Sequence, residues 1–382
     1  MSKLLEQINN DKKDMTLGEV VTFHRGYDLP LTEIRSGPYP VVFSNGRKEY
    51  HSEFKVKGPG VFTGRSGSLG GMFYIDEDYW PHNTTLYVSD FHGNDPKYCY
   101  YFLSSFDFEK FNAGTGVPTL NRNHIHGIPV KVASVLTQKQ IALILSAYDE
   151  KIENNNKIIK NLELTAQTIF NEWFVNFRFP GHEKVKFVDS EMGKIPEEWE
   201  VKNIKDIFTV ILGGTPSREK PEYWDGDIPW INSGEVNKLR ILEATEHITE
   251  MGLNKSNARL IKSGATVLAI TGATLGQVSR LEIDSTANQS VVGIFDEEDI
   301  LNEYLYLYIT NNILDLISGA SGGAQQHINK QMVETYQILI PSENIIKDFN
   351  KKIKPNYILI KELFKENISL KSQRDQLLAK LI

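Results

Sequence analysis

The chain has 382 residues, of which 40% are hydrophobic and 24% are charged, and its formal net charge is −7 at pH 7. This length suggests two domains with connecting elements, and the composition excludes wholesale disorder and a fibrous repeat. The net negative charge argues against a surface coated uniformly with basic groups for nucleic acid, although it leaves room for a local basic face.

The sequence lacks the usual signs of membrane insertion and export. No apolar run approaches the roughly 20 residues of a membrane span, and residues 1–14 are polar, unlike a signal peptide. One cysteine, Cys99, cannot form an internal disulfide. We therefore expect a cytoplasmic protein. Charge is uneven, since residues 176–344 contain 25 acidic and 15 basic side chains, whereas residues 345–382 contain four acidic and nine basic.

Four short patterns occur twice in the same order, which predicts a duplicated module of mixed strand and helix. In the first module they are Leu17–Val20, Arg65–Gly70, Asn83–Leu86 and Gly114–Asn121, and their counterparts are Ile204–Ile207, Thr271–Gly276, Asn288–Val291 and Gly322–Asn329. The offset grows from 187 to 208 residues as loops differ in length. Strand-forming residues, Val61-Phe62 and Val267-Leu268, precede the second pattern in both modules.

A long helical pattern follows the first module. Seam residues recur at alternating spacings of four and three, as in a heptad repeat. They are Ile141, Leu145, Tyr148, Ile152, Asn155, Ile159, Leu162, Ala166, Ile169 and Trp173. Thr137 and Gln140 suit a capping box, and Pro180-Gly181 provides a stop, so we expect a central helix over residues 138–175.

A second heptad seam predicts a C-terminal helix over residues 343–382. Its seam residues are Ile346, Phe349, Ile353, Asn356, Ile360, Leu363, Asn367, Leu370, Arg374, Leu377 and Leu381. Pro355 should kink this helix or break its first turns.

The two helices are each too poor in apolar surface to stand alone, so we expect their seams to pair. Because each helix follows an equivalent module, pseudo-twofold symmetry requires an antiparallel pair. Asn155 would fix the register, since a polar seam residue penalises misaligned pairings. The alternative is that each helix packs on its own module. The expected fold is α+β, with two repeated mixed α/β domains, residues 1–137 and 176–342, separated by a long antiparallel two-helix coiled coil.

Motifs of catalytic and metal sites are nearly absent, and we predict no catalytic residue and no metal ligand. Residues 319–323 fit the G-x-S-x-G pattern around Ser321, but they follow a helical stretch where a nucleophile requires a strand. His124 and His126 lack a nearby third metal ligand. Residues 64–71 suit either a phosphate-binding nest or a tight turn.

The turns of both modules instead carry side chains suited to nucleic acid. Arg bonds guanine bidentately, Asn and Gln bond adenine, and Ser, Thr and Lys reach phosphates. The DNA-binding candidates of the first module are Arg25, Asn45, Arg47, Lys48, Arg65, Ser66, Asn121 and Arg122. Those of the second module are Thr215, Ser217, Arg218, Asn232, Thr271, Thr274, Gln325, Gln326, His327, Asn329 and Lys330. Each alone is more typical of a polar loop or helix cap, but their recurrence at matched places favours DNA binding.

With these features, the chain resembles the specificity (S) subunit of a Type I restriction-modification system over essentially its whole length. The segments that carry the resemblance are Tyr148–Asn154 (YDEKIEN), Ala166–Val175 (AQTIFNEWFV), Met192–Trp199 (MGKIPEEW), Gly213–Ser217 (GGTPS) and Gly322–Asn329 (GGAQQHIN). The central helix departs from the family by lacking the usual proline-led start, and the last helix departs by containing Pro355.

The resemblance implies two target recognition domains, each of which reads one half of a bipartite double-stranded DNA site, with the paired helices as spacer and docking surface. It implies two methyltransferase (M) subunits, which bind S-adenosylmethionine and methylate adenine, as partners. Restriction (R) subunits, which use ATP and Mg, are further partners. No cofactor is expected in this chain. Phe170, Trp173 and Phe174 are the partner-binding candidates, unless they pack under the second module.

Two other functions stay open on the sequence alone. One is a coiled-coil adaptor that joins proteins without reading DNA, and the other is a hydrolase or nuclease that uses Ser321. A helix of 34 residues is about 50 Å long, or roughly 15 base pairs, so the specificity-subunit hypothesis predicts two half-sites with an unread spacer.

Overall fold

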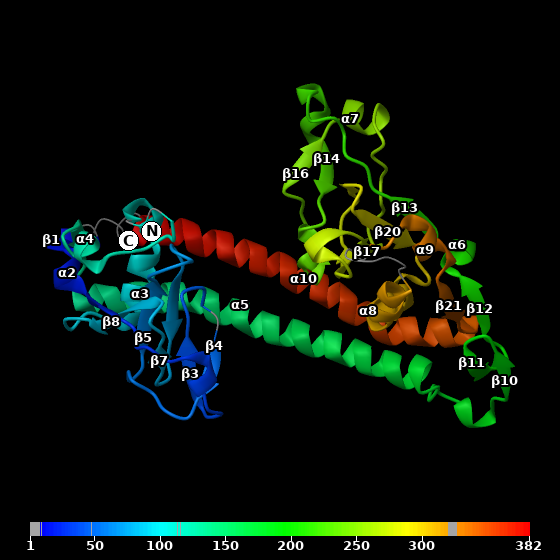
Figure 1. Cartoon of the computed structure of the whole chain (residues 1–382), viewed down its shortest axis with the longest axis horizontal. Coiled ribbons are helices and arrows are strands. Elements are labelled where there is room, and N and C mark those ends of the chain that lie inside the picture. The colour runs from blue at the N-terminus through cyan, green and yellow to red at the C-terminus, as the bar shows by residue number, and fades with distance from the viewer. Residues whose placement is uncertain (1–7, 9, 47, 113, 115, 320–326) are drawn as a thin grey trace. The chain divides into compact units, whose positions relative to one another are not determined.

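The structure is a computed structural model that describes residues 8, 10–46, 48–112, 114, 116–319 and 327–382 (Figure 1). The chain divides into two compact units. Unit 1 contains Met1–Asn154 and Ile368–Ile382, and unit 2 contains Asn155–Asn367. Each unit therefore holds one module and one segment of each of two long helices.

Unit 1 contains a four-stranded antiparallel sheet with the strand order β2-β8-β5-β6. A three-stranded sheet has the order β4-β3-β7, and β1 pairs with β9. The strands are β1 Lys13–Thr16, β2 Thr22–Arg25, β3 Tyr39–Val42, β4 Lys48–His51, β5 Gly60–Gly64, β6 Met72–Ile75, β7 Trp80–Pro81, β8 Thr85–Asp90 and β9 Pro129–Val132.

The short helices of unit 1 are α2 Leu17–Val20, α3 Pro96–Ser104 and α4 Arg122–His126, with 3-10 turns η1 Leu31–Glu33 and η2 Phe108–Phe111. The Asp95 side chain caps α3 by accepting from the backbone N of Tyr98, and Pro96 suits the first helical position. One apolar core holds these helices on the sheet and includes Phe23, which is fully buried.

Unit 2 repeats this topology with longer connections. Its sheets have the orders β13-β20-β17-β18-β15, β16-β14-β19 and β12-β21, and β10 and β11 form a hairpin. The strands are β10 Phe187–Ser190, β11 Gly193–Pro196, β12 Glu200–Asn203, β13 Thr209–Leu212, β14 Trp224–Ile231, β15 Arg240–Ile241, β16 Glu246–Ile248, β17 Thr266–Ala269, β18 Val278–Leu281, β19 Thr286–Ala287, β20 Val291–Phe295 and β21 Gln337–Ile340.

The helices of unit 2 are α6 Ile204–Ile207, α7 Glu250–Asn254, α8 Asn302–Ser318 and α9 Lys330–Thr335, with 3-10 turns η4 His182–Lys184, η5 Pro221–Tyr223, η6 Glu235–Asn237 and η7 Gly272–Thr274. The duplication predicted from the sequence is confirmed, because each sheet of unit 1 has a counterpart in unit 2, which adds strand β15 and the β10–β11 hairpin. Both α2 and α6 begin with a capping box, formed by Thr16 with Glu19 and by Asn203 with Asp206. β5 and β17 precede the matched turns, as expected.

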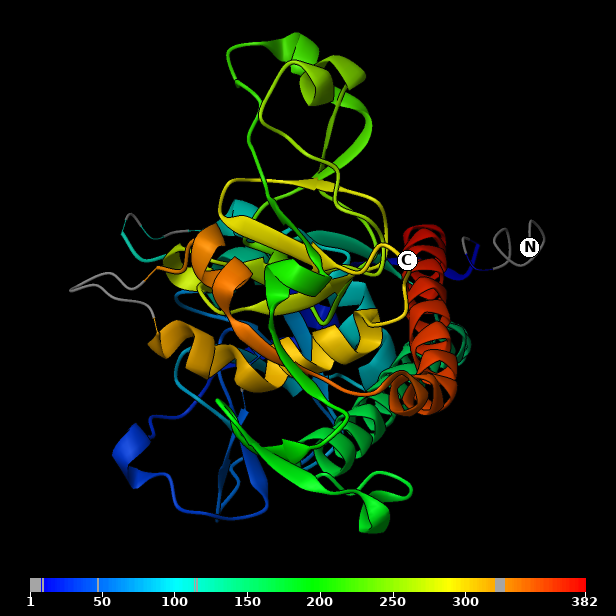
Figure 2. The same ribbon diagram turned by 90° about the vertical axis from the view of Figure 1, so that its right-hand side faces the viewer.

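The two long helices are α5, Val135–Phe170, which ends in a π-helical turn at Asn171–Val175, and α10, Glu343–Leu381. In unit 2 their segments pair antiparallel, side by side in Figures 1 and 2. Buried Asn155 donates from Nδ2 to Asn367 Oδ1 (2.9 Å) and Glu366 Oε2 (2.8 Å), whereas at the other end Trp173 lies 6.0 Å from Phe349 between ring centroids.

The segments in unit 1 are joined in the same sense. Arg374 Nη1 donates to Asp149 Oδ1 at 2.5 Å, and Leu381 is buried in the same core as Ile141 and Leu145. Every predicted seam residue of both helices is buried or half-buried. The long helices therefore pair along their seams and also pack on the modules, which combines the two arrangements expected from the sequence.

Two details of the helices differ from the sequence prediction. α5 begins at Val135, ahead of the expected capping box, because the Ser134 carbonyl already accepts from the backbone N of Gln138 at 2.8 Å. α10 also continues through Pro355. Pro355 is exposed, while the neighbouring Ile353 and Tyr357 are buried, so tertiary packing overrides the local cost of the proline.

Two further observations concern the rest of the described chain. None of its described helices is long and apolar enough to cross a membrane. Cys99 is buried in the core of unit 1, and burial raises the pKa of its thiol above the ordinary value, which keeps the thiol protonated.

Candidate nucleic-acid interface

In unit 1, four loops gather at one end of the four-stranded sheet. β2 and β5 both end where β8 begins, since Arg25 pairs with Leu86 and Gly64 pairs with Thr85. The backbone N of Arg65 donates to the carbonyl of Thr84 at 2.8 Å. The Arg65 carbonyl accepts from the backbone N of Leu120, also at 2.8 Å, which adds a fourth loop. We call residues 25–28, 65–67, 83–84 and 118–121 loop cluster 1.

Unit 2 has the same arrangement at the equivalent end of its sheet. The loops after β13, β14 and β17 meet the loop before β20 and the segment before α9. Four hydrogen bonds join them, from Gly214 N to Ala287 O (2.7 Å), Asn288 N to Ile231 O (2.9 Å), Ile270 N to Ser290 O (2.9 Å) and Ile328 N to Ile270 O (3.1 Å). We call residues 213–215, 231–232, 271–274, 288–290 and 327–330 loop cluster 2.

A glycine at the equivalent position of each module allows the loops of each cluster to approach one another closely. A Cβ on Gly26 would lie 2.0 Å from the carbonyl oxygen of His82, and one on Gly213 would lie 2.1 Å from that of Asn288. No other residue fits at such an approach. Gly26 and Gly213 are thus required where two strand ends pack against each other.

The charged side chains of loop cluster 1 are Arg25, Asp28 and Arg65, and they differ in whether they bond other residues of the chain. Arg25 Nη2 donates to Asp28 Oδ1 at 3.0 Å, and Asn83 donates to the same oxygen. The hydrogen bond from Asn83 holds the pKa of the Asp28 carboxyl below its ordinary value, and the nearby Arg25 acts in the same direction. The half-buried Arg65 guanidinium makes no hydrogen bond or ion pair with another described residue, so its donors are available to a ligand.

Other first-module candidates lie around this cluster or apart from it. Asn45 is exposed in the turn after β3, next to Ser44, whose carbonyl approaches Gly64. Arg122 in α4 bonds the carbonyl of Phe23 at 3.5 Å. The remaining candidates are Ser66 and Asn121, which belong to loop cluster 1, Lys48, which pairs with Glu77 at 3.6 Å, and Arg47, which lies outside the described residues.

Most second-module candidates lie in loop cluster 2 and already have partners. Thr215 donates to Gln289 Oε1 at 2.5 Å, and Asn329 caps α9. Five other candidates lie in this cluster. They are Asn232, which accepts from Gly234 N at 2.8 Å, Thr271 and Thr274, of which Thr274 donates to the Thr271 carbonyl at 3.4 Å, Lys330, which pairs with Glu334 at 3.1 Å, and the exposed His327. Gln325 and Gln326 lie outside the described residues, as does Ser321.

Arg218 has a structural environment that separates it from the other candidates. Its guanidinium stacks 3.5 Å from the Trp224 ring centroid and bonds both Glu246 oxygens, at 2.5 and 3.0 Å. The hydrogen bond from Arg218 lowers the pKa of the Glu246 carboxyl. The backbone carbonyl of the neighbouring Ser217 accepts a hydrogen bond from Trp224 Nε1, so Ser217 and Arg218 both contact Trp224.

The structure corrects the expected partner surface. Phe170, Trp173 and Phe174 are only 1%, 7% and 5% exposed and belong to the core of unit 2. Phe174 packs against Phe349, with ring centroids 4.9 Å apart, and Phe170 packs against Tyr304. All three pack under the module in the core of unit 2, and they are not available to a partner in this structure.

Sequence reasoning missed Asp28, Asn83 and Gln289 as members of the clusters. Asn83 and Gln289 lie in a repeated pattern, so the repeat itself is the signal that could have indicated them. Asp28 has no such signal, because it approaches Asn83 only through the strand pairing of β2 with β8.

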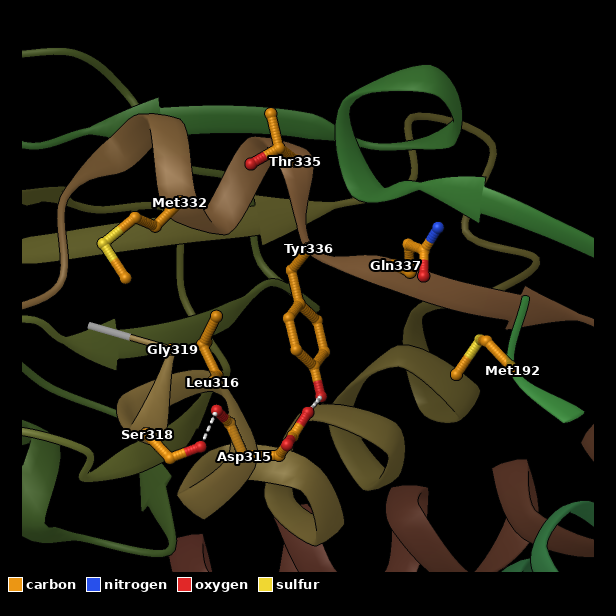
Figure 3. A pocket seen from close by; sticks show the side chains of 9 residues that line it. All are labelled: Met192, Asp315, Leu316, Ser318, Gly319, Met332, Thr335, Tyr336 and Gln337. Atoms are coloured by element: carbon orange, nitrogen blue, oxygen red, sulfur yellow. Dashed lines mark hydrogen bonds between the residues drawn. The ribbon is translucent and has the colours of Figure 1, made fainter. Parts of the chain in front are cut away.

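A cavity and a half-buried histidine lie outside the two loop clusters. The cavity, of about 510 Å³, lies between α8 and α9. Its lining includes Tyr336, whose hydroxyl donates to Asp315 Oδ2 at 2.9 Å, and Figure 3 shows the two side chains pointing toward each other. His126 Nε2 accepts from the backbone N of Phe23 at 3.1 Å, and burial lowers the pKa of His126, as expected for a structural histidine. No group of three metal-ligating side chains occurs in the described part of the chain.

Comparisons with known proteins give a consistent result. Residues 9–164 and 196–354 match the family described as "Type I restriction modification DNA specificity domain". The chain is 24% identical over 295 residues to the Type I restriction enzyme MjaIX specificity subunit of Methanocaldococcus jannaschii, covering 75% of this chain and 68% of that protein. It is 23% identical over 354 residues to the EcoR124I/EcoR124II specificity subunit of Escherichia coli, covering 83% of each.

The fold has a counterpart among solved structures. The crystal structure of the Type-I restriction-modification system S subunit from M. genitalium superimposes with a TM-score of 0.63 and 16% identity, covering 97% of this chain and 96% of that one. This likeness shows the α+β fold, and the two family matches show the repeated domain. The chain therefore belongs to the family of type I restriction-modification DNA specificity subunits.

Proposed function

We propose that this chain reads a bipartite DNA site, with loop cluster 1 contacting one half-site and loop cluster 2 the other. Specificity subunits are the non-catalytic members of these systems, and catalysis belongs to partner subunits. The observation that carries the proposal is the recurrence of the same polar loop cluster at the equivalent sheet end of both modules.

The chemistry of each cluster suits base edges and phosphates. Arg65 offers a guanidinium with unused donors, which matches guanine or a phosphate. Thr215 and Gln289 in unit 2 present a hydroxyl and an amide, and amides match adenine. Backbone hydrogen bonds between the loops hold these side chains on a rigid sheet end, which lowers the entropy cost of binding.

The partners follow from the family. Two methyltransferase subunits with S-adenosylmethionine would methylate adenine within the site, and restriction subunits with ATP and Mg would cleave DNA. A methyltransferase must flip its target base, and DNA distortion by the recognition contacts would help supply that energy. This chain would position the duplex, while its partners carry out the reactions.

The net charge of −7 predicts that the chain alone binds DNA weakly and that tight binding requires a partner that adds positive surface. The test is fluorescence anisotropy with labelled DNA that contains the site, for the chain alone and for its complex with the methyltransferase, across salt concentrations. We expect weak, salt-sensitive binding by the chain and tight, sequence-selective binding by the complex. Nanomolar binding by the chain alone at physiological salt would contradict the account.

A further inference from the structure

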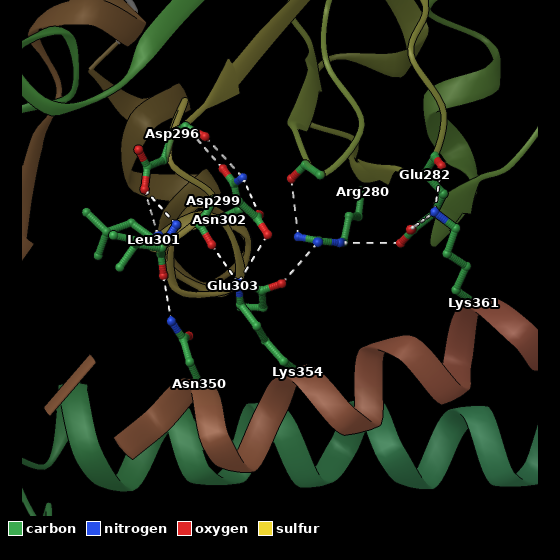
Figure 4. A network of polar contacts seen from close by, with 12 residues as sticks. Arg280, Glu282, Asp296, Asp299, Leu301, Asn302, Glu303, Asn350, Lys354 and Lys361 are labelled. Carbon is green, nitrogen blue, oxygen red and sulfur yellow. Dashed lines mark hydrogen bonds and ion pairs between the residues drawn. The ribbon is translucent and has the colours of Figure 1, made fainter. Parts of the chain in front are cut away.

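Unit 2 contains a group of charged side chains that the proposed DNA contacts do not use, and Figure 4 shows the part of it around Arg280. Its two arginines are buried, whereas its lysines are half-buried and Asp299 is exposed. It has four cations and four anions from five different parts of the chain. We call it the ionic clamp, and its members are Arg240, Arg280, Lys354, Lys361, Glu163, Glu282, Asp299 and Glu303.

Arg240 of β15 lies at one end of the clamp, and its side chain is fully buried. Its Nε donates to Glu163 Oε1 of α5 at 3.1 Å, and its Nη1 donates to Glu282 Oε1 at 3.0 Å. The guanidinium also lies 4.2 Å from the ring centroid of Tyr357 in α10. Burial alone would lower the pKa of Arg240, but Glu163 raises it above the ordinary value, so the ion pair persists.

Arg280 of β18 continues the clamp toward α8. Its Nη2 donates to Glu303 Oε1 at 3.1 Å, and its Nη1 donates to the Gly264 carbonyl at 3.2 Å. From α10, Lys361 bonds the Glu282 carbonyl at 2.9 Å and Lys354 bonds Asp299 Oδ2 at 3.1 Å. The clamp therefore links the sheet edge and α8 of the second module to both long helices.

The same module also has an apolar contact with the helices. Tyr304 to Ile309 of α8 share one buried cluster with Ile159 of α5 and Ile353 and Ile360 of α10. Apolar contact is non-directional, so it holds the module against the helices without selecting one set of partner atoms. The ionic clamp adds contacts from β15 and β18 to those of α8, and charged hydrogen bonds have fixed geometry.

Stability alone does not explain such a clamp. Replacing a buried ion pair with apolar residues of similar volume is often neutral or stabilising, whereas a mispaired buried charge is costly. The clamp thus penalises every module orientation except the one in which all its charges meet. We propose that the ionic clamp fixes the orientation of the second recognition module on the helix pair, with Arg240 as a positioning residue, and so sets which spacer length between half-sites the complex accepts.

The inference rests on the proposed function, and the experiment separates the two. The double variant Arg240→Met with Glu163→Met removes one charge of each sign and leaves the remaining clamp charges balanced. The matched control, Lys262→Met with Glu297→Met, removes an exposed pair that joins at 2.5 Å in the same unit. Each protein is assembled with its methyltransferase, and methylation rates are measured on DNA with the preferred spacer and with spacers one base pair shorter or longer.

We expect wild type and control to discriminate among spacers and the double variant to lose about fivefold of that discrimination, at an unchanged thermal midpoint and unchanged half-sites. Unchanged discrimination in a folded double variant would overturn the inference. If the double variant does not fold, Lys361→Met provides the test, since the half-exposed Lys361 leaves Glu282 paired with two arginines. It should weaken discrimination in the same direction, and no change would overturn the inference. A wild-type complex without spacer preference would refute the proposed function itself.

Discussion

Replacement of Arg65 with alanine tests the DNA-reading role of loop cluster 1 most sharply. The Arg65 guanidinium bonds no other described residue, and the backbone bonds of Arg65 to Thr84 and Leu120 do not depend on its side chain. The substitution should therefore change the free energy of unfolding by no more than about 0.5 kcal/mol. Its effect should fall almost wholly on DNA binding.

The expected loss of affinity depends on what Arg65 contacts. A bidentate contact to guanine is worth about 1–3 kcal/mol, so its loss weakens binding roughly 5- to 150-fold and relaxes the preference at one base. A phosphate contact instead lowers the salt slope by about one and weakens all sequences alike. Both outcomes leave the other half-site unchanged, because loop cluster 2 belongs to the other unit.

The assay is anisotropy of the complex assembled with its methyltransferase, over a range of salt concentrations and on DNA with single-base changes. Arg178→Ala is the control. It removes an exposed arginine that pairs with Glu172 at 3.3 Å outside both loop clusters, so it should cost no more than about 0.5 kcal/mol of stability and little DNA affinity. An Arg65→Ala complex with wild-type affinity and salt slope would refute the reasoning and favour the coiled-coil adaptor.

Three further predictions concern the core, a buried tyrosine and the helices. Phe174→Ala should cost about 3–5 kcal/mol in urea unfolding while the folded protein still binds its partner, and lost partner binding at full stability would restore Phe174 to the partner surface. Burial raises the pKa of Tyr306 to about 12 from the ordinary 10.0, so its contribution to stability is complete below pH 10 and is lost as the pH rises toward 12. Between pH 9 and pH 11 the wild type should lose about 1.4 kcal/mol more than Tyr306→Phe in denaturant titrations, and equal losses would be inconsistent with this assignment. Insertion of one four-residue turn into both α5 and α10, about 6 Å, should lengthen the preferred spacer by one or two base pairs with the half-sites unchanged, and an unaltered spacer would exclude this role for the helices.

Most of the fold could be predicted from short patterns in the sequence. The capping boxes at Thr16 and Asn203 depend on residues three apart, and the helix seams depend on a period of seven, so both are readable from the sequence. The duplication is readable because two modules with the same strand order need the same turn residues at the same places. The glycines at Gly26 and Gly213 are the plainest case, since no side chain fits at either position.

Features that depend on tertiary packing could not be predicted from the sequence. The sequence does not indicate that Arg218 stacks on Trp224, nor that Phe174 lies beside Phe349. The ionic clamp joins Glu163 to Arg240, residues that are far apart in sequence. No spacing rule relates them, because the strand and helix that carry them meet only after the module has folded.

The most direct test of two reading modules in one chain is coexpression with the methyltransferase of its system, followed by mapping of every methylated adenine in the host genome. The account predicts one split motif, with two short defined halves and a gap of constant length. A continuous motif, a gap of variable length or the same methylation pattern without this chain would contradict it.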